Sequence, residues 1–312
     1  MTTERLDLRV PDGLAGERVD RVVATLAERS RAEVRTVLEA GGVRLDGATV
    51  TRGSTPVASG QRLEVDLPAR DDGTVAPDPG VEVTVVLEDP DFVVVDKAPE
   101  VVVHPGAGQR EGTLVAGLLA RYPEIAALAD PGERVRPGIV HRLDKGTSGL
   151  LVVARSARGL ASLREQMAGR AVSRIYSAFV QGHVAEDRGV VDAPIGRSAR
   201  QPTAMAVRED GRPARTRYHV RRRYDAPYPV TELEVELETG RTHQIRVHLA
   251  SIGHPVVNDP RYGHRRDGRL AEGRVALHAS ALSFTHPRTG EPVRVTRDLP
   301  ADLAALRGGT SG

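Results

Sequence analysis

The sequence lacks cysteine and tryptophan altogether, and it contains few other aromatic residues. Without cysteine the chain can form neither disulfides nor thiolate metal sites. Phe, Trp and Tyr make up 3% of the residues, which argues against a nucleic-acid site built on rows of stacking rings. No apolar run approaches the roughly 20 residues of a membrane helix, and the first residues, MTTERLDLRV, do not resemble a signal peptide. We therefore expect a cytoplasmic protein with no membrane partner.

Lysine is also scarce. It occurs only at Lys97 and Lys145, so 42 of the 44 basic residues are arginine. Arginine grips phosphates through paired hydrogen bonds and stacks on bases. A GC-rich genome favours the same residue, however, and that explanation accounts for most of the bias. The net charge is only +2, so gross charge does not identify a nucleic-acid binder either.

The 312 residues exceed what one ordinary domain needs, and no internal repeat is present. We expect a small unit over residues 1–67. Residues 68–80 read PARDDGTVAPDPG, a composition typical of a linker. A larger domain is expected over residues 81–305, followed by a flexible tail over residues 306–312.

The small unit is predicted to hold two short helices followed by small strands. Helical spacing of apolar residues indicates the first helix, at Val19, Val22, Val23 and Leu26. Ser30 is a plausible N-cap for the second, whose inner face carries Val34, Val37 and Leu38. Strands are indicated at residues 43–47 and 63–67, where apolar and polar residues alternate.

In the larger domain, predicted strands outnumber helices and do not alternate regularly with them. We expect strands at residues 83–87, 92–95, 150–154, 173–182 and 231–239, and helices at residues 113–121, 160–167 and 242–251. This order predicts a mixed α+β sheet with flanking helices and argues against a doubly wound fold.

A short loop before a buried strand carries the first candidate for chemistry. The stretch from His141 to Arg155 reads HRLDKGTSGLLVVAR. It places Asp144 between Arg142 and Lys145, whose charges favour the ionised carboxylate. Glycines and hydroxyl residues predict a tight loop, and the run LLVVA predicts a core strand. A solvated surface ion pair is the ordinary explanation for a lone aspartate.

A second stretch of sequence favours a functional role for Asp144 over a solvated surface ion pair. Residues 239–263 read TGRTHQIRVHLASIGHPVVNDPRYG. A helix is expected from about residue 242 to residue 251, with Ile245, Leu249 and Ile252 on its buried face. Arg246 lies at the margin of that face, so its guanidinium needs a carboxylate partner. Asp144 is the natural candidate.

Together the two stretches resemble the RluA/RluD family of RNA pseudouridine synthases. FVVVDKAPEVVVHPG, from Phe92, matches a further family motif less closely, because Lys97-Ala98-Pro99-Glu100 stands where Lys-Pro-Ala-Gly is common. SRIYSAFVQG matches the tyrosine strand, with Arg174 in place of the usual lysine. The small unit resembles the S-four RNA-binding domain in residues 17–20, 30–31 and 34–47. Long motifs in the right order are a specific signal.

The resemblance implies a mixed, largely antiparallel sheet of the pseudouridine synthase type and a small α/β RNA-binding domain in front. It also implies that the protein isomerises uridine in RNA to pseudouridine without metal or cofactor. The expected partner is large-subunit (23S) ribosomal RNA or a pre-50S particle, and transfer RNA remains an alternative. We expect a monomer.

The resemblance also assigns roles to residues. Asp144 would be the catalytic carboxylate, attacking either the sugar or the base, and Arg246 would hold it charged and aimed. Tyr176 would lie against the uracil, with its hydroxyl a candidate for the proton step at C5. Arg142 would help to fill the space that the flipped base leaves. Further RNA contacts are expected from His141, Thr147, Arg241 and His243 in the larger domain, and from Arg31, Arg35 and Arg44 in the small one.

Three other classes fit less well. A non-catalytic RNA-binding protein would not need both Asp144 and Arg246. A serine hydrolase would need G-x-S-x-G, but the sequence around Ser148 reads GTSGL. A metal hydrolase would need spaced ligands, and His243, His248 and His254 lack the i, i+4 spacing of a helical zinc pair.

Overall fold

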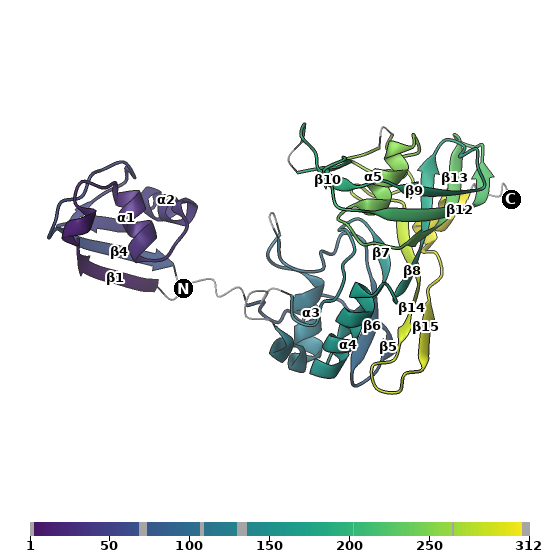
Figure 1. The fold of residues 1–312 in the computed structure, drawn as a ribbon, viewed down its shortest axis with the longest axis horizontal. Helices are drawn as coiled ribbons and strands as arrows, with labels where there is room; N and C mark the ends of the chain where they lie inside the picture. The colour runs from purple at the N-terminus through teal and green to yellow at the C-terminus, as the bar shows by residue number, and fades with distance from the viewer. Residues whose placement is uncertain are drawn as a thin grey trace. The chain divides into compact units, whose positions relative to one another are not determined.

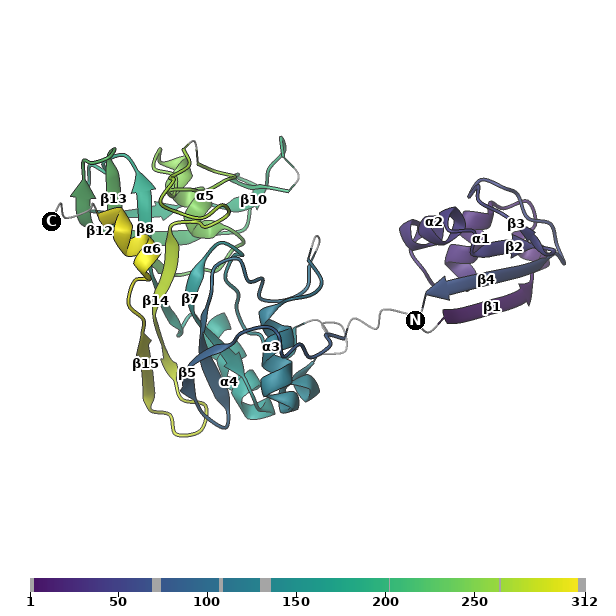
Figure 2. The ribbon, with the colours of Figure 1, turned by 180° about the vertical axis from the view of Figure 1, so that it is seen from behind.

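The computed structural model describes residues 3–68, 74–106, 109–129, 136–201, 203–263 and 265–307. The described residues up to 68 and those from 74 onward belong to two separate compact units (Figures 1 and 2).

The N-terminal unit packs two helices on a four-stranded antiparallel sheet. The strands are β1 (Thr3–Arg9), β2 (Val43–Leu45), β3 (Ala48–Thr49) and β4 (Arg62–Pro68), in the order β1-β4-β2-β3. The helices are α1 (Val19–Leu26) and α2 (Arg31–Glu39), preceded by the short 3-10 helix η1 (Asp12–Leu14). Ser30 caps α2 as predicted, and Glu33 bonds back to its N–H to complete a capping box. Strand β1 was not expected from the sequence.

The larger unit is built on a nine-stranded sheet. Its order is β5-β6-β7-β14-β8-β13-β12-β9, with β15 paired to β14. The strands are β5 (Thr84–Glu88), β6 (Phe92–Lys97), β7 (Ser148–Ala154), β8 (Ser173–Gln181), β9 (Arg188–Asp192), β12 (Arg215–Tyr224), β13 (Val230–Leu237), β14 (Leu277–Thr285) and β15 (Pro292–Thr296). Among the described strand pairs of this sheet only β7–β14 is parallel. The predicted fold class, mixed and largely antiparallel, is confirmed.

The remaining elements flank this sheet. A separate hairpin joins β10 (Ile195–Arg197) to β11 (Met205–Val207). The helices are α3 (Leu114–Arg121), α4 (Ala157–Ala168), α5 (Gln244–Ser251) and α6 (Ala301–Ala304), with 3-10 helices η2 (Pro123–Leu128) and η3 (Ala305–Arg307). In the part of the chain that is described, no helix combines the length and the apolar character needed to cross a membrane.

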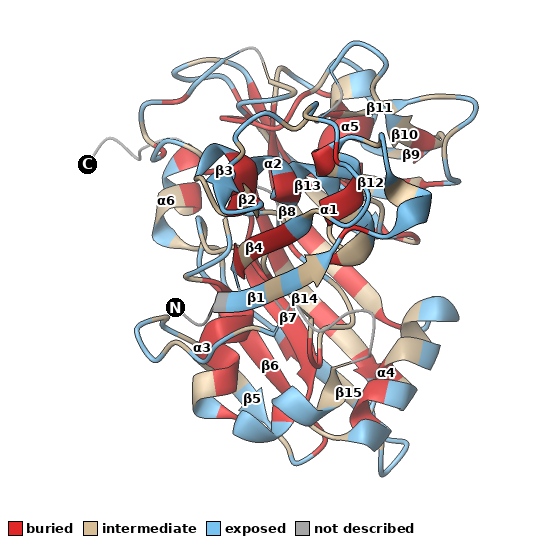
Figure 3. Cartoon of the chain, turned by 90° about the vertical axis from the view of Figure 1, so that its left-hand side faces the viewer, coloured by how far each residue is buried: buried red, intermediate tan, exposed pale blue. Residues whose placement is uncertain are grey.

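Helices on both faces bury the strand that leads away from the Asp144 loop. Leu151 and Val153 of β7 share a cluster with Leu114 of α3, whereas Leu150 and Val152 share another with Leu160 of α4. Because side chains alternate along a strand, the two helices cover opposite faces (Figure 3). All seven residues of β7 are buried, which explains its continuous apolar run.

Three expectations need correction at the ends of elements. Residues 74–80 do not behave as linker throughout, because Val75 packs on the larger core and Asp78 N–H donates to the Ala116 carbonyl. The tail does not begin at residue 306, since Leu306 is buried in η3. Ile252 was predicted to be buried, but it is 38% exposed as the residue that ends α5. Residues 69–73 and 308–312 lie outside the described residues.

Candidate active site

The loop that carries Asp144 is shaped by two glycines. The Thr147 N–H donates to the Asp144 carbonyl, which turns the chain into β7. A Cβ at position 146 would lie 2.1 Å from the Gly273 carbonyl oxygen, and one at position 149 would lie 2.4 Å from that of Ala279. Gly149 also has a backbone φ of +112°, an angle that residues with a side chain rarely adopt. The glycine spacing therefore reflects close backbone approach beneath the loop.

Two fully buried cations anchor this loop from below. The Arg274 guanidinium donates to the Gly146 carbonyl and Ser148 Oγ, at 3.0 and 2.9 Å. Lys97 Nζ donates to three carbonyls, including that of Lys145 at 3.2 Å. Burial, with repulsion from Arg274, lowers the pKa of Lys97 to about 7. Sequence reasoning missed both anchors, because their acceptors are carbonyls that only the fold brings together.

Asp144 is paired with Arg246, as the sequence predicted. Arg246 Nη1 lies 2.9 Å from Asp144 Oδ2, across 102 residues of sequence. A second carboxylate, Asp259, which the sequence analysis missed, accepts from Nε and Nη2 of Arg246 at 2.7 and 2.9 Å. Burial opposes the charge on Arg246, but the hydrogen bonds that it donates to Asp259 and the negative charge of Asp144 raise its pKa above the usual value. The guanidinium is thus fixed between two carboxylates and holds Asp144 in one orientation.

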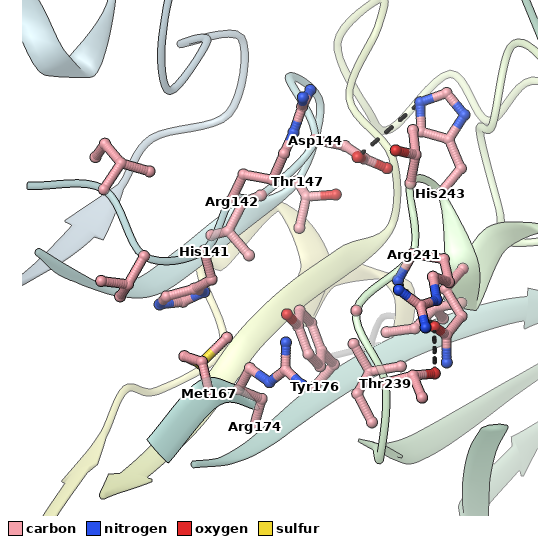
Figure 4. A pocket seen from close by; sticks show the side chains of 18 of the residues that line it. His141, Arg142, Asp144, Thr147, Met167, Arg174, Tyr176, Thr239, Arg241 and His243 are labelled. Carbon is pink, nitrogen blue, oxygen red and sulfur yellow. Dashed lines mark hydrogen bonds and ion pairs between the residues drawn. The ribbon is translucent and has the colours of Figure 1, made fainter. Parts of the chain in front are cut away.

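His243 lies on the other side of Asp144, with Nε2 4.0 Å from Oδ1 (Figure 4). Tyr262 Oη accepts from the Met205 N–H and lies 2.8 Å from His243 Nδ1. Tyr262 Oη thus holds the imidazole ring of His243 from the side of Nδ1, with Nε2 facing Asp144. Burial lowers the pKa of His243 despite the charge of Asp144, so the ring is neutral at pH 7.

These groups face a cavity of about 700 Å³. Tyr176 of β8 lines it, and its hydroxyl points into the open space (Figure 4). Burial and the charge of Asp144 raise the pKa of Tyr176 to about 12, although Arg174 opposes the shift. Tyr176 is therefore a neutral phenol at pH 7. The cavity thus combines a fixed carboxylate with an aromatic wall.

The other predicted RNA-contacting residues of this unit also line the cavity. Arg142 is exposed at its mouth. Thr147 is buried, and its Oγ1 has no partner among the described residues. His141 Nε2 accepts the Val152 N–H at 3.1 Å, and burial with the charge of Arg174 lowers the pKa of His141 to about 3. Arg241 donates to the Pro213 carbonyl.

The predicted RNA-binding arginines of the N-terminal unit are on or near its surface. Arg31 and Arg35 are exposed on α2, and Arg35 lies 3.8 Å from Glu39. Arg44 on β2 is half-buried and donates to Asp66 at 3.2 Å. The structure leaves Arg31 and Arg35 accessible to a ligand and pairs Arg44 with an acid.

The three histidines considered as possible zinc ligands, His243, His248 and His254, contact other groups of the protein. His248 is fully buried and bridges Thr216 Oγ1 and the Ala193 carbonyl. His254 Nδ1 contacts the Gln181 carbonyl. Over the described ranges, no three or more His, Asp or Glu side chains are grouped to hold a metal ion.

Comparisons with known proteins agree with this architecture. A family model described as RNA pseudouridylate synthase matches residues 91–251, and one described as S4 domain matches residues 17–63. Ribosomal large subunit pseudouridine synthase D of Xanthomonas campestris is 43% identical over 309 residues, covering 95% of this chain and 90% of the relative. An RNA pseudouridine synthase of Chloroflexus aurantiacus is 46% identical over 304 residues, covering 94% of this chain and 90% of the relative.

A solved structure shares the larger unit's fold. Human RNA pseudouridylate synthase domain containing 1 aligns with a TM-score of 0.58 and 31% identity, over 72% of this chain and 86% of that protein. The chain therefore belongs to the RNA pseudouridylate synthase family, whose members isomerise uridine in RNA to pseudouridine, and it carries an S4 domain in front of the catalytic unit.

Proposed function

We propose that this protein converts uridine to pseudouridine in large-subunit ribosomal RNA, with Asp144 as the reacting carboxylate. The observation that carries the proposal is the placement of Asp144 at the cavity, held by Arg246 at 2.9 Å and facing the same space as Tyr176. The relative from Xanthomonas campestris, named for the large ribosomal subunit, supports the choice of RNA.

The reaction is an isomerisation, so its atoms balance without an oxidant or water. The bond from uracil N1 to the ribose breaks, the ring turns, and C5 bonds to the same ribose carbon. The proton lost from C5 is replaced by one gained at N1. Arg246 holds the Asp144 carboxylate at the cavity for attack on an electron-poor carbon, and that carbon belongs either to the sugar or to the base.

Tyr176 is proposed to lie against the uracil. A base that works well near neutral pH has a pKa close to that pH, and the pKa of Tyr176 is about 12. The phenol can therefore take part in the C5 proton step only by giving up its own proton as it receives another. The carboxylate in the same cavity, Asp144, is the acceptor that we propose for that relay.

The S4 unit is proposed to hold the RNA through phosphate contacts from Arg31, Arg35 and Arg44. Arg44 would share its guanidinium between Asp66 and a phosphate, so we expect it to contribute least. We propose that the protein acts as a monomer in the cytoplasm, where ribosomal RNA is assembled into particles.

The function is tested by tritium release from RNA labelled at uracil C5. Large-subunit ribosomal RNA transcripts should release tritium with the purified protein, and transfer RNA transcripts should release much less. Release should persist after EDTA treatment if Mg²⁺ needed for RNA folding is replaced by a polyamine. The proposal fails if neither RNA reacts, and its choice of substrate fails if transfer RNA reacts faster.

The cellular target is tested by mapping pseudouridines in ribosomal RNA with and without the gene. Specific sites should disappear from the large-subunit RNA and return when the wild-type chain is supplied. Unchanged ribosomal sites, with loss at a transfer RNA position, would contradict the proposed substrate.

A further inference from the structure

Arg174 is a buried cation in the wall of the active-site cavity. It lies on β8 two residues before Tyr176, so both side chains point from the same face of the strand (Figure 4). The residue is 8% exposed. Its guanidinium lies against the backbone of Gly240, where a Cβ would come within 2.8 Å of Nη1. Glycine at position 240 therefore leaves room for the guanidinium at the cavity wall.

This guanidinium has no partner among the described residues. Its Nε is buried without a hydrogen bond. The described acids that line the cavity are Asp144 and Glu238. Asp144 is bound by Arg246 at 2.9 Å, and Glu238 is bound by Arg217 at 2.6 Å. Because a buried charge is costly unless it is paired, Arg174 is poised for an anion that comes from outside the chain.

Two further donors at the same cavity are unsatisfied. His141 Nε2 accepts a backbone N–H, so the ring proton of the neutral imidazole is on Nδ1, which is buried without a partner. Thr147 Oγ1 is also buried and unpaired. Both residues line the cavity together with Arg174. A ligand with a negative charge and acceptor oxygens would compensate the guanidinium of Arg174 beside these two residues.

Phosphate fits these requirements better than the uracil does. A uracil carbonyl could accept one N–H, but it would leave the buried positive charge uncompensated. A phosphate compensates the charge and offers two oxygens to the planar guanidinium fork. Arg136, Arg164 and Arg170 line the same cavity, so the local potential favours an anion.

We propose that Arg174 binds a backbone phosphate of the RNA strand next to the target uridine, and so positions the flipped nucleotide against Tyr176. This inference rests on the proposed function only in taking RNA as the ligand. Arg174 acts by positioning the substrate, and the reacting atoms are left to Asp144.

The test pairs protein variants with RNA in which one phosphate at a time, on either side of the target uridine, is replaced by a neutral methylphosphonate. Binding is measured in the Asp144→Asn background so that no turnover intervenes. Arg174→Met should weaken binding of unmodified RNA about 10- to 100-fold, the scale of hydrogen bonds to a charged group. For one phosphate, the methylphosphonate should weaken binding to the Arg174 protein but have little further effect on Arg174→Met.

The controls separate this role from a structural one. Arg294→Met removes an exposed arginine of β15 that does not line the cavity, and it should respond to every methylphosphonate as the parent protein does. Arg174→Met should unfold at the same or a higher temperature than the parent, because it removes an unpaired buried charge. Arg174→Lys should recover part of the affinity.

The outcomes decide the proposal. Equal sensitivity of Arg174→Met and its parent at every phosphate, or unchanged affinity of Arg174→Met, would overturn it. Coupling of Arg174 to substitution of a uracil carbonyl oxygen in place of a phosphate would overturn it too, as would marked thermal destabilisation of Arg174→Met without phosphate coupling. Coupling to one phosphate supports it even if the wild-type protein releases no tritium from that RNA, in which case only the proposed function fails.

Discussion

Two buried arginines line the same cavity and have opposite surroundings. Arg246, on α5, is 6% exposed and bound by the carboxylates of Asp144 and Asp259. Arg174, on β8, is 8% exposed and has no described partner. The guanidinium of Arg246 is paired within the fold and holds Asp144, the proposed reacting carboxylate, in one orientation. The guanidinium of Arg174 costs free energy in the free protein, and we infer that substrate compensates it.

The strongest test of this contrast is thermodynamic. Arg246→Met leaves Asp144 and Asp259 without their shared cation, and breaking a buried pair from one side costs about 3–5 kcal/mol. Arg174→Met should change the free energy of unfolding by less than about 1 kcal/mol, or stabilise the protein. Urea unfolding of the two variants measures both values. Similar losses in the two variants would break the comparison.

A second prediction tests whether Asp259 fixes the orientation of Arg246. Asp259→Asn keeps the shape of the side chain but removes one of the two negative charges that flank Arg246. The guanidinium then no longer has a fixed orientation. We expect turnover to fall about 10- to 100-fold, on the scale of losing a charged hydrogen bond, with RNA affinity unchanged. Single-turnover tritium release measures the rate. Wild-type turnover would show that Asp144 alone orients Arg246.

The S4 unit offers a contrast with Arg174, because Arg31 and Arg35 are exposed at its surface. Deleting residues 1–68 should weaken RNA binding and flatten its dependence on salt, since each lost phosphate contact removes about 0.7–0.9 from the slope of log K against log salt. Filter binding over a range of salt concentrations gives both quantities. Equal slopes for the full and shortened chains would remove the S4 unit from RNA binding.

The smallest expected effect is that of the Arg174 charge on the pKa of His141. The pKa of His141 is lowered to about 3 in the folded protein, against an ordinary value of about 6.5 in the unfolded chain. The unfolded state therefore binds more protons between these values, and stability falls as pH drops through this window.

Arg174→Met should raise the pKa of His141 and reduce that loss by about 1 kcal/mol or less. Urea unfolding at pH 8 and at about pH 3.5, close to the folded-state pKa of His141, checks the difference, and His141→Gln identifies the part due to this ring. The same acid loss in Arg174→Met and the parent would show that the charge of Arg174 does not act on His141.

Local pattern and family motif predicted much of this structure. Helical spacing predicted α1 and α2, and the apolar run of β7 predicted a core strand. The motifs also indicated the Asp144–Arg246 pair across 102 residues. Strands β12, β14 and β15 were not predicted, because their pairing depends on partners that are distant in sequence.

The supporting contacts could not be predicted for a related reason. Lys97 and Arg274 act through backbone carbonyls from separate segments, and carbonyls carry no sequence signal. Asp259 lies in the family motif of residues 239–263, but only the fold shows that it shares Arg246 with Asp144. The lack of a partner for Arg174 can be seen only when the whole cavity wall is in place.

The most direct measurement is tritium release by Asp144→Asn together with its RNA affinity. The substitution keeps the size of the side chain but removes the charge that Arg246 holds in place. The account predicts no release above background under conditions in which the wild-type protein completes the reaction, and RNA binding that is largely intact, because phosphate contacts elsewhere dominate affinity. Substantial pseudouridine formation by Asp144→Asn would contradict it.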